Sequence, residues 1–226
     1  MKRVMVFAPH PDDDILGCGG SMARHTARGD AVRVVYCCSG ENGSPEHGPQ
    51  ELSAIRRAEA QRAVALVGAE VCAFLSLQDG FFTADAAVSE DILRLLRRER
   101  PHIIYVPHAG ENNRDHQLCH RMVTEAVGRA AGPWFKAQGP AWRVERILAY
   151  EVWTPLPSPG LYRDISPWME QKLAALRQHR SQLKYMAYDD AVRGLNRYRA
   201  VGSGLGCEYC ECFQVLRLTE EGEDRR

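Results

Sequence analysis

The sequence has 226 residues, 45% hydrophobic and 26% charged, which is enough chain to bury a globular core without disulfides or a structural metal. Its 29 basic and 29 acidic residues give a net charge of zero, which argues against a polybasic nucleic-acid binder. No apolar run approaches the roughly 20 residues that span a bilayer, and the apolar start at residues 4–9 is too short for a signal peptide. We therefore expect a cytoplasmic protein, with no nucleic-acid and no membrane partner, whose eight cysteines stay reduced.

Predicted strands and helices alternate along most of the chain. β-Branched and apolar runs predict strands at 2–8, 31–38, 71–77, 101–107, 144–153 and 207–218. Helical spacing of apolar residues predicts helices at about 14–28, 50–67, 85–98 and 115–130, and one long helix at 166–186. Residues 195–206 are expected to be irregular, and 219–226 to form a frayed tail. The alternation is typical of a Rossmann-like, doubly wound α/β fold with a mostly parallel sheet between two helix layers, and we expect 1–226 to form one domain.

Two polar clusters directly follow predicted strands. Residues 10–14 come after the first strand, and residues 108–116 come after the fourth. In parallel α/β sheets, ligands bind outside the carboxyl ends of the strands. Both clusters therefore fall at the same edge of the sheet, where they can form one site.

The residue types in these clusters suit a metal centre. Zinc binds neutral imidazole and carboxylate, and a catalytic zinc commonly has three protein ligands and one open position. His10, Asp12 or Asp13, and His116 offer such a set, with one carboxylate left to accept a proton from water. The alternative, on spacing alone, is that the acids cap a helix and the histidine lies in a loop.

One stretch of sequence carries a specific family resemblance. Residues 8–20, Ala-Pro-His-Pro-Asp-Asp-Asp-Ile-Leu-Gly-Cys-Gly-Gly, resemble the opening motif of the LmbE-like (PIG-L) N-deacetylase family. That motif reads His-Pro-Asp-Asp-Glu, followed by a Leu-Gly-Cys-Gly-Gly type of turn. The family's second motif, which ends in Asp-His, is similar to residues 113–116. Weaker likenesses follow in the family's order and extend the resemblance over nearly the whole chain, at 51–60, 150–155, 179–182, 194–199 and 209–213.

Carried over to this chain, the resemblance implies metal ligands at His10, Asp13 and His116 and a general base at Asp12. It implies hydrolysis of the N-acetyl group of an amino sugar or amino-sugar glycoside, with Asp12 taking a proton from water that zinc activates. Asp115 matches a carboxylate that orients a neighbouring imidazole or the ligand shell. Zinc is the expected cofactor, and the same ligands also accept Fe(II) or Co(II).

Four further residues are candidates for substrate contact. Arg56 matches a family arginine that contacts the substrate, and Glu211 matches a recurrent glutamate that positions a loop or the substrate. Each has a plain alternative, a solvated helix charge for Arg56 and an outward strand charge for Glu211. Trp153 follows a strand at the expected active edge and is the candidate for stacking on a sugar. Asn113 stands where many members carry His, and it can donate a hydrogen bond but cannot titrate.

The chain departs from the family pattern at Asn113, and also at Asp14, where the motif has Glu and where we expect the residue only to open a helix. His108 on the same loop as Asn113 is a candidate for the missing imidazole, or else an ordinary loop histidine. The alternatives to a deacetylase are a metal-binding sugar-recognition protein without turnover, and a hydrolase of another amide or ester. The resemblance also implies a homo-oligomer, either a trimer or a hexamer.

Two small motifs invite other interpretations. The glycine-rich stretch 17–20 lacks the pattern of a phosphate loop, so we expect it to let a helix approach the sheet closely. Cys207, Cys210 and Cys212 have no visible partner cluster to complete a structural zinc site, so we expect them to be strand side chains.

Overall fold

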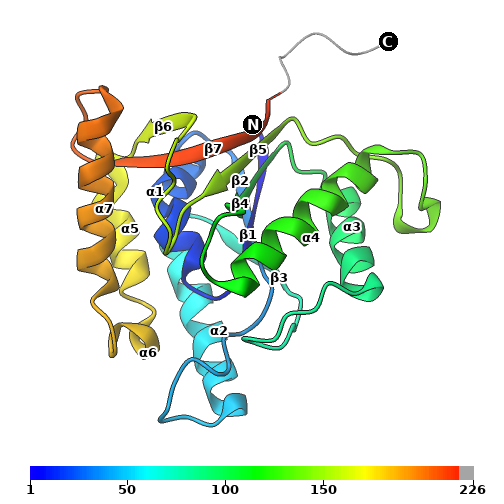
Figure 1. The fold of residues 1–226 in the computed structure, drawn as a ribbon, viewed down its shortest axis with the longest axis horizontal. Coiled ribbons are helices and arrows are strands. Elements are labelled where there is room, and N and C mark those ends of the chain that lie inside the picture. The colour runs from blue at the N-terminus through cyan, green and yellow to red at the C-terminus, as the bar shows by residue number, and fades with distance from the viewer. Residues whose placement is uncertain (219–226) are drawn as a thin grey trace.

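A computed structural model describes residues 1–218, and its centre is a seven-stranded sheet with helices on both faces (Figure 1). The strands are β1 Arg3–Ala8, β2 Ala31–Tyr36, β3 Glu70–Phe74, β4 Ile103–Pro107, β5 Arg146–Tyr150, β6 Leu161–Asp164 and β7 Cys210–Leu218. The helices are α1 Asp13–Ala27, α2 Pro49–Leu66, α3 Ala86–Glu99, α4 Arg114–Ala131, α5 Met169–Leu176, α6 Arg180–Leu183 and α7 Tyr188–Ser203, with short 3₁₀ turns at Lys136–Gln138 and Ser166–Trp168. The predicted tail 219–226 lies outside the described residues.

The strand order is β3-β2-β1-β4-β5-β7-β6. Strands β1 to β5 pair in parallel, whereas β7 runs antiparallel to both β5 and β6. Strands β2 and β3 are added on one side of β1, and β4 and the later strands are added on its other side. The predicted doubly wound, mostly parallel α/β fold is confirmed.

Strand β1 is buried on both faces, which explains its continuous apolar sequence. Val4, Val6 and Ala8 belong to the core under α1, α2 and α5, while Met5 and Phe7 belong to the core under α3 and α4. The alternation follows from the two-residue period of a strand. The central strand therefore anchors both helix layers, and the loop at its end is held from both sides.

Helix α1 packs unusually close to the sheet. A Cβ on Gly17 would lie 2.2 Å from the ring of Tyr150 on β5, and one on Gly20 would lie 2.8 Å from Ile165. Between them Cys18 leaves the helical region, with φ −145° and ψ 19°. The glycines therefore allow close helix packing, as the sequence predicted.

The segment after β5 differs most from the sequence-based expectation. The long helix expected at 166–186 is broken into a 3₁₀ turn, α5 and α6, and the segment 195–206, expected to be irregular, lies largely within α7. The short strand β6 pairs only with β7 and was not predicted. Tertiary contacts supply the missing signal, because Asn196 of α7 donates to the Cys210 carbonyl (3.0 Å) and accepts from Lys172 of α5 (2.9 Å).

A search of residues 1–218 for a helix of bilayer-spanning length and hydropathy finds none.

A buried ion pair ties α1, α5, α7 and β7 together. Lys172 is fully buried, and its ammonium donates to Glu211 (2.8 Å), Asn196 (2.9 Å) and the Leu16 carbonyl (2.9 Å). Glu211 in turn accepts the backbone N–H groups of Gly20 and Ser21 at 2.9 and 2.8 Å. These N–H groups follow the kink at Cys18, so Glu211 caps the second half of α1 from inside the core.

We expect Lys172→Met to lower the free energy of unfolding by about 3–5 kcal/mol, because it leaves the Glu211 carboxylate buried without its counter-charge. The measurement is urea unfolding followed by circular dichroism. Lys172→Met combined with Glu211→Gln is expected to be more stable than Lys172→Met alone. Lys184→Met is the matched control, since Lys184 pairs with Glu46 at the surface. A loss no larger than that of the control would contradict the assignment.

Candidate metal centre

The two polar clusters meet between β1 and β4, where the order in which strands are added to the sheet reverses. Strands β1 and β4 are neighbours in the sheet, with Val6 opposite Tyr105. Residues 10–13 follow β1, and residues 111–116 follow β4 and open α4. The prediction that both clusters lie at one sheet edge is confirmed, and this edge is the switch point at which doubly wound folds bind ligands.

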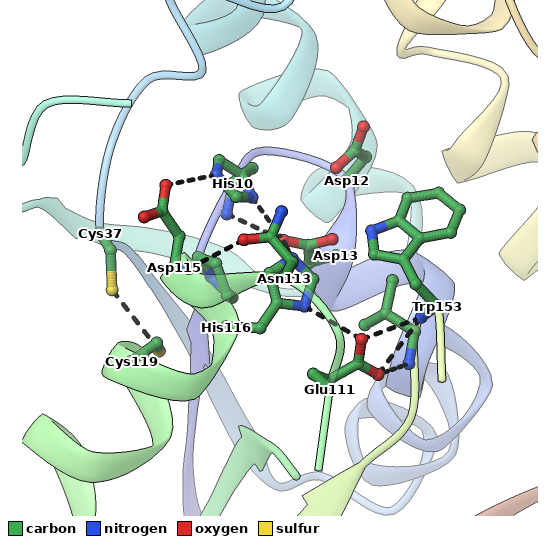
Figure 2. A network of polar contacts seen from close by, with 12 residues as sticks. His10, Asp12, Asp13, Cys37, Glu111, Asn113, Asp115, His116, Cys119 and Trp153 are labelled. Carbon is green, nitrogen blue, oxygen red and sulfur yellow. Dashed lines mark hydrogen bonds and ion pairs between the residues drawn. The ribbon is translucent and has the colours of Figure 1, made fainter. Parts of the chain in front are cut away.

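Three predicted metal ligands come together there (Figure 2). The carboxylate of Asp13 lies 3.1 Å from Nδ1 of His10 and 3.3 Å from Nε2 of His116. The ligand atoms of these three residues all lie within 4.8 Å of one another. One His from the β1 loop, one Asp from the start of α1 and one His from the first turn of α4 therefore share one small volume.

The chemistry of this set fits a divalent cation. His116 is fully buried, and neither of its ring nitrogens makes a hydrogen bond of proper geometry among the described residues, although the carboxylates of Asp13 and Glu111 lie 3.3 and 3.6 Å away. A buried polar atom without a partner is costly, and a metal bond removes that cost for a neutral imidazole nitrogen. Burial alone would raise the pKa of Asp13, but His116 and His10 hold it well below its usual range, so the carboxylate is ionised and ready to bind.

Asp12 is adjacent to the cluster but is held differently. Its backbone adopts φ 131°, which an L-residue rarely does, and its side chain is buried. Burial raises the pKa of Asp12 to about 7, although Arg56 opposes this rise. A carboxylate with a pKa near neutrality can both accept and return a proton, as a general base must.

Arg56 holds Asp12 in place. It is 3% exposed, and its guanidinium donates to Asp12 (3.2 Å) and to the carbonyls of Pro11 (2.7 Å) and Gly40 (3.1 Å). A Cβ on Gly40, which has φ +67°, would lie 2.3 Å from the guanidinium. Arg56 therefore contacts Asp12 in this structure, and its predicted contact with a substrate stays a prediction.

Asp115 and Asn113 sit at the start of α4 with separate tasks. Asp115 lies 3.3 Å from Nε2 of His10 and accepts the N–H groups of Gly80 (2.8 Å) and Phe82 (3.4 Å). It therefore faces the ring of His10, a predicted metal ligand, and also fixes the loop after β3. Asn113 caps α4, because its side-chain Oδ1 accepts the backbone N–H of Asp115 (2.8 Å). In Figure 2 its amide nitrogen points away from Asp115.

Glu111 is a site residue that the sequence analysis missed. It is 1% exposed, lies 3.6 Å from Nδ1 of His116, and accepts the N–H groups of Val152 (2.7 Å) and Trp153 (3.2 Å). It thus connects a metal ligand to the loop that carries Trp153. The only available signal was its position in the polar loop after β4.

Trp153 lies at the open side of the site. Its side chain is 38% exposed and packs against Tyr188, with ring centroids 5.1 Å apart. Partial burial and then the charge of Asp12 raise the pKa of Tyr188. The Tyr188 hydroxyl therefore lies within electrostatic reach of the Asp12 carboxylate. The aromatic pair, defined here as Trp153 and Tyr188, gives the site an apolar rim, and Tyr188 was not predicted.

The structure does not bring two other candidates to the site. Glu211 is 1% exposed and engaged with Lys172 and α1, so its placement does not fit the predicted substrate contact. His108 is buried, its Nδ1 accepts from Gly110 (3.1 Å) and its Nε2 faces the Thr154 carbonyl (2.7 Å). Because both nitrogens are engaged in the scaffold, His108 does not supply the imidazole that Asn113 replaces.

Comparison with known proteins places these features in a family. Residues 5–127 match the PIG-L model, described as GlcNAc-PI de-N-acetylase. The 1D-myo-inositol 2-acetamido-2-deoxy-alpha-D-glucopyranoside deacetylase of Mycobacterium sp. (strain KMS) is 31% identical, over 83% of this chain and 76% of that protein. This chain belongs to the PIG-L family. The predicted membership is confirmed, and the predicted hydrolytic deacetylase agrees with the activity named for this relative.

Solved structures support the same fold. The N,N'-diacetylchitobiose deacetylase from Pyrococcus horikoshii matches with a TM-score of 0.85 and 26% identity, over 95% of this chain and 84% of that chain. GalB, the 4-carboxy-2-hydroxymuconate hydratase from Pseudomonas putida KT2440, matches with a TM-score of 0.83 and 27% identity, over 97% of this chain and 99% of that chain. The PIG-L fold thus carries both an amide hydrolase and a hydratase among its relatives.

We expect His10→Ala, Asp13→Ala and His116→Ala each to lose bound divalent metal, because each variant leaves only two of the three ligands. The measurement is metal content by mass spectrometry after dialysis against buffer with a trace of zinc. His47→Ala is the control, since this half-buried loop histidine pairs with Glu51, which is not one of the predicted metal ligands. Stoichiometric metal in all three ligand variants would refute the ligand set.

Proposed function

We propose that this PIG-L protein is a zinc-dependent N-deacetylase that removes the acetyl group from an N-acetylated amino sugar or amino-sugar glycoside. The observation that carries the proposal is the adjacency of a buried base, Asp12, to the His10–Asp13–His116 cluster at the switch point of the sheet. The deacetylase activity named for its relatives supports the same reaction.

Zinc, when bound, makes a water molecule more acidic and polarises a carbonyl group. Asp12 takes the proton of the attacking water and later returns it to the nitrogen of the leaving amine. Arg56 keeps the Asp12 carboxylate aimed at this water. Asp115 fixes the ring of His10, and Glu111 faces the far nitrogen of His116.

The acetyl oxygen gains negative charge as water attacks, and it needs a hydrogen-bond donor. The amide nitrogen of Asn113 supplies this donor, because its oxygen is already committed to the N–H of Asp115. A carboxamide stabilises the oxyanion without titrating, whereas histidine at this position would change charge near neutral pH. Asn113 therefore leaves Asp12 as the group that moves protons.

The aromatic pair explains why a sugar suits the site. Sugar rings present apolar C–H faces that pack on aromatic side chains. Trp153 and Tyr188 form such a surface beside the base, and Trp153 remains accessible to a ligand. The predicted role of Trp153 in substrate binding is retained.

A hydratase is the second candidate, favoured by the match to GalB over almost the whole of both chains. The same predicted metal ligands and the same base would serve the addition of water to an activated double bond. It does not release an amine. The two reactions are therefore separated by their products rather than by the residues that perform them.

We expect the zinc-loaded protein to release acetate from at least one member of a panel of N-acetylated amino sugars and glycosides. Asp12→Asn is expected to lower kcat by about 10²–10⁴-fold, because the base is lost, while zinc content stays stoichiometric. Acetate is measured by a coupled enzyme assay, and zinc by mass spectrometry.

A protein with stoichiometric zinc that releases no acetate, yet changes the ultraviolet absorbance of unsaturated dicarboxylic acids, would favour the hydratase. Binding of a panel sugar without any turnover would instead favour the sugar-recognition protein.

We expect Arg56→Met to move the acidic limb of the kcat/KM profile to higher pH. The Arg56 charge lowers the pKa of Asp12, so its removal raises that pKa, and the ionised base is then lost at a higher pH as the solution is acidified. Arg57→Met, on the same helix but against Phe74, is the control. A profile that falls in height without a shift of its acidic limb would contradict this role of Arg56.

The assembly and compartment proposals follow from the family resemblance and the cysteines. We propose a homo-oligomer, trimeric or hexameric. The exposed apolar side chains of Tyr198, Val201 and Leu205, on and just after α7, provide a candidate contact surface. All eight cysteines are free thiols, which supports the proposed cytoplasmic location.

A further inference from the structure

The ring of His10 faces two different sets of ligand atoms. Its Nδ1 faces Asp13, within the cluster already described. Its Nε2 faces two other carboxylates, Asp79 at 3.2 Å and Asp115 at 3.3 Å. The side of the ring away from the catalytic cluster is therefore surrounded by oxygen atoms as well.

A thiol completes this second set. The ligand atoms of His10, Cys38 and Asp79 all lie within 4.8 Å of one another. Imidazole, thiolate and carboxylate are the three side-chain ligands that zinc and cobalt use. The second set differs from the catalytic one in containing sulfur.

The local charge also calls for a cation. An imidazole has at most one hydrogen to give from Nε2, yet two carboxylates face that atom. Asp115 has two backbone N–H donors, from Gly80 and Phe82. Within residues 1–218 no backbone N–H donates to the Asp79 oxygen that faces His10, because the Asn42 N–H donates to the other oxygen (2.9 Å). A divalent ion bound there would neutralise the carboxylate charge that a single N–H cannot.

The second set is rigid before any ion arrives. Cys38 follows β2, and its sulfur accepts the N–H of Gly40 (3.2 Å). The carboxylate of Asp79 accepts the backbone N–H of Asn42, and the backbone N–H of Asp79 donates to the Glu41 carboxylate (2.9 Å). These two hydrogen bonds fix Asp79. The side chains of His10 and Asp79 are 13% and 12% exposed, whereas Cys38 is fully buried.

We propose that His10, Cys38 and Asp79 form a second, lower-affinity divalent-cation site whose occupation inhibits the enzyme. The site rests on the proposed function, because it shares His10 with the catalytic cluster. An ion bound to Nε2 and Cys38 would release to solvent the proton that Nε2 shares with Asp115 and the thiol proton that Cys38 donates to the Pro9 carbonyl, and it would share the His10 ring with the catalytic metal. Excess zinc therefore lowers turnover, while stoichiometric zinc supports it.

Cobalt(II) titration of the metal-free protein tests the site by a readout that does not require turnover. The first equivalent occupies a cluster without sulfur, so it gives only visible ligand-field bands. The second equivalent is expected to give a near-ultraviolet thiolate-to-cobalt charge-transfer band. Cys38→Ser is expected to abolish this band, and Cys72→Ser, which changes a thiol on β3, to retain it.

Asp79→Asn keeps the thiol and serves as the second variant. It is expected to weaken binding of the second cobalt by about tenfold or more. It is also expected to raise the zinc concentration that halves turnover by a similar factor. In Cys38→Ser the first cobalt still binds, and inhibition by excess zinc is lost.

Absence of the charge-transfer band from the parent protein, or its persistence in Cys38→Ser, would overturn the second site. Neither result affects the acetate-release assay, which tests the deacetylase separately. Conversely, a protein that binds two cobalt ions but releases no acetate would keep the second site and refute the proposed function.

Discussion

Three consecutive carboxylates, Asp12 to Asp14, are buried at the start of α1, and each one has a different polar partner. Arg56 pairs with Asp12, two imidazoles flank Asp13, and the Tyr36 hydroxyl donates to Asp14 (2.9 Å). Burial without such partners would cost several kcal/mol for each ion. Because Arg56, Tyr36 and His116 come from three different segments, satisfying this charge brings α2, β2 and α4 to the end of β1.

The same requirement divides the labour among the acids. Asp13, held between imidazoles, stays ionised and can bind metal. Burial raises the pKa of Asp12 and of Asp14 to about 7, but Asp14 is enclosed by the core while Asp12 borders the cluster. Three identical side chains thereby acquire different chemistry from their surroundings. Glu111 connects this cluster to the surface, because it contacts both His116 and the backbone of the loop that carries Trp153.

The sequence predicted the parts of the fold and site that local rules control. The strands up to β5 have apolar runs long enough to specify themselves, and the polar clusters at their ends fall together because parallel strands end at one edge. The segment from α5 to β7 was predicted poorly, since α7 and β6 depend on partners distant in the sequence, such as Lys172 and Glu211. Arg56 and Glu211 were recognised as important, but their partners inside the protein could not be read from spacing.

The sequence by itself therefore determined the sheet class, the family, and the meeting of His10, Asp13 and His116 beside Asp12 at one sheet edge. Those features follow from residue order around two strand ends. Only the tertiary structure decided what each remaining side chain touches: Arg56 contacts Asp12, Glu211 contacts Lys172, and the two ring nitrogens of His10 face different carboxylates. The physical reason is that a buried polar group must find its partner wherever packing brings one, and that partner lies on a segment far away in the chain.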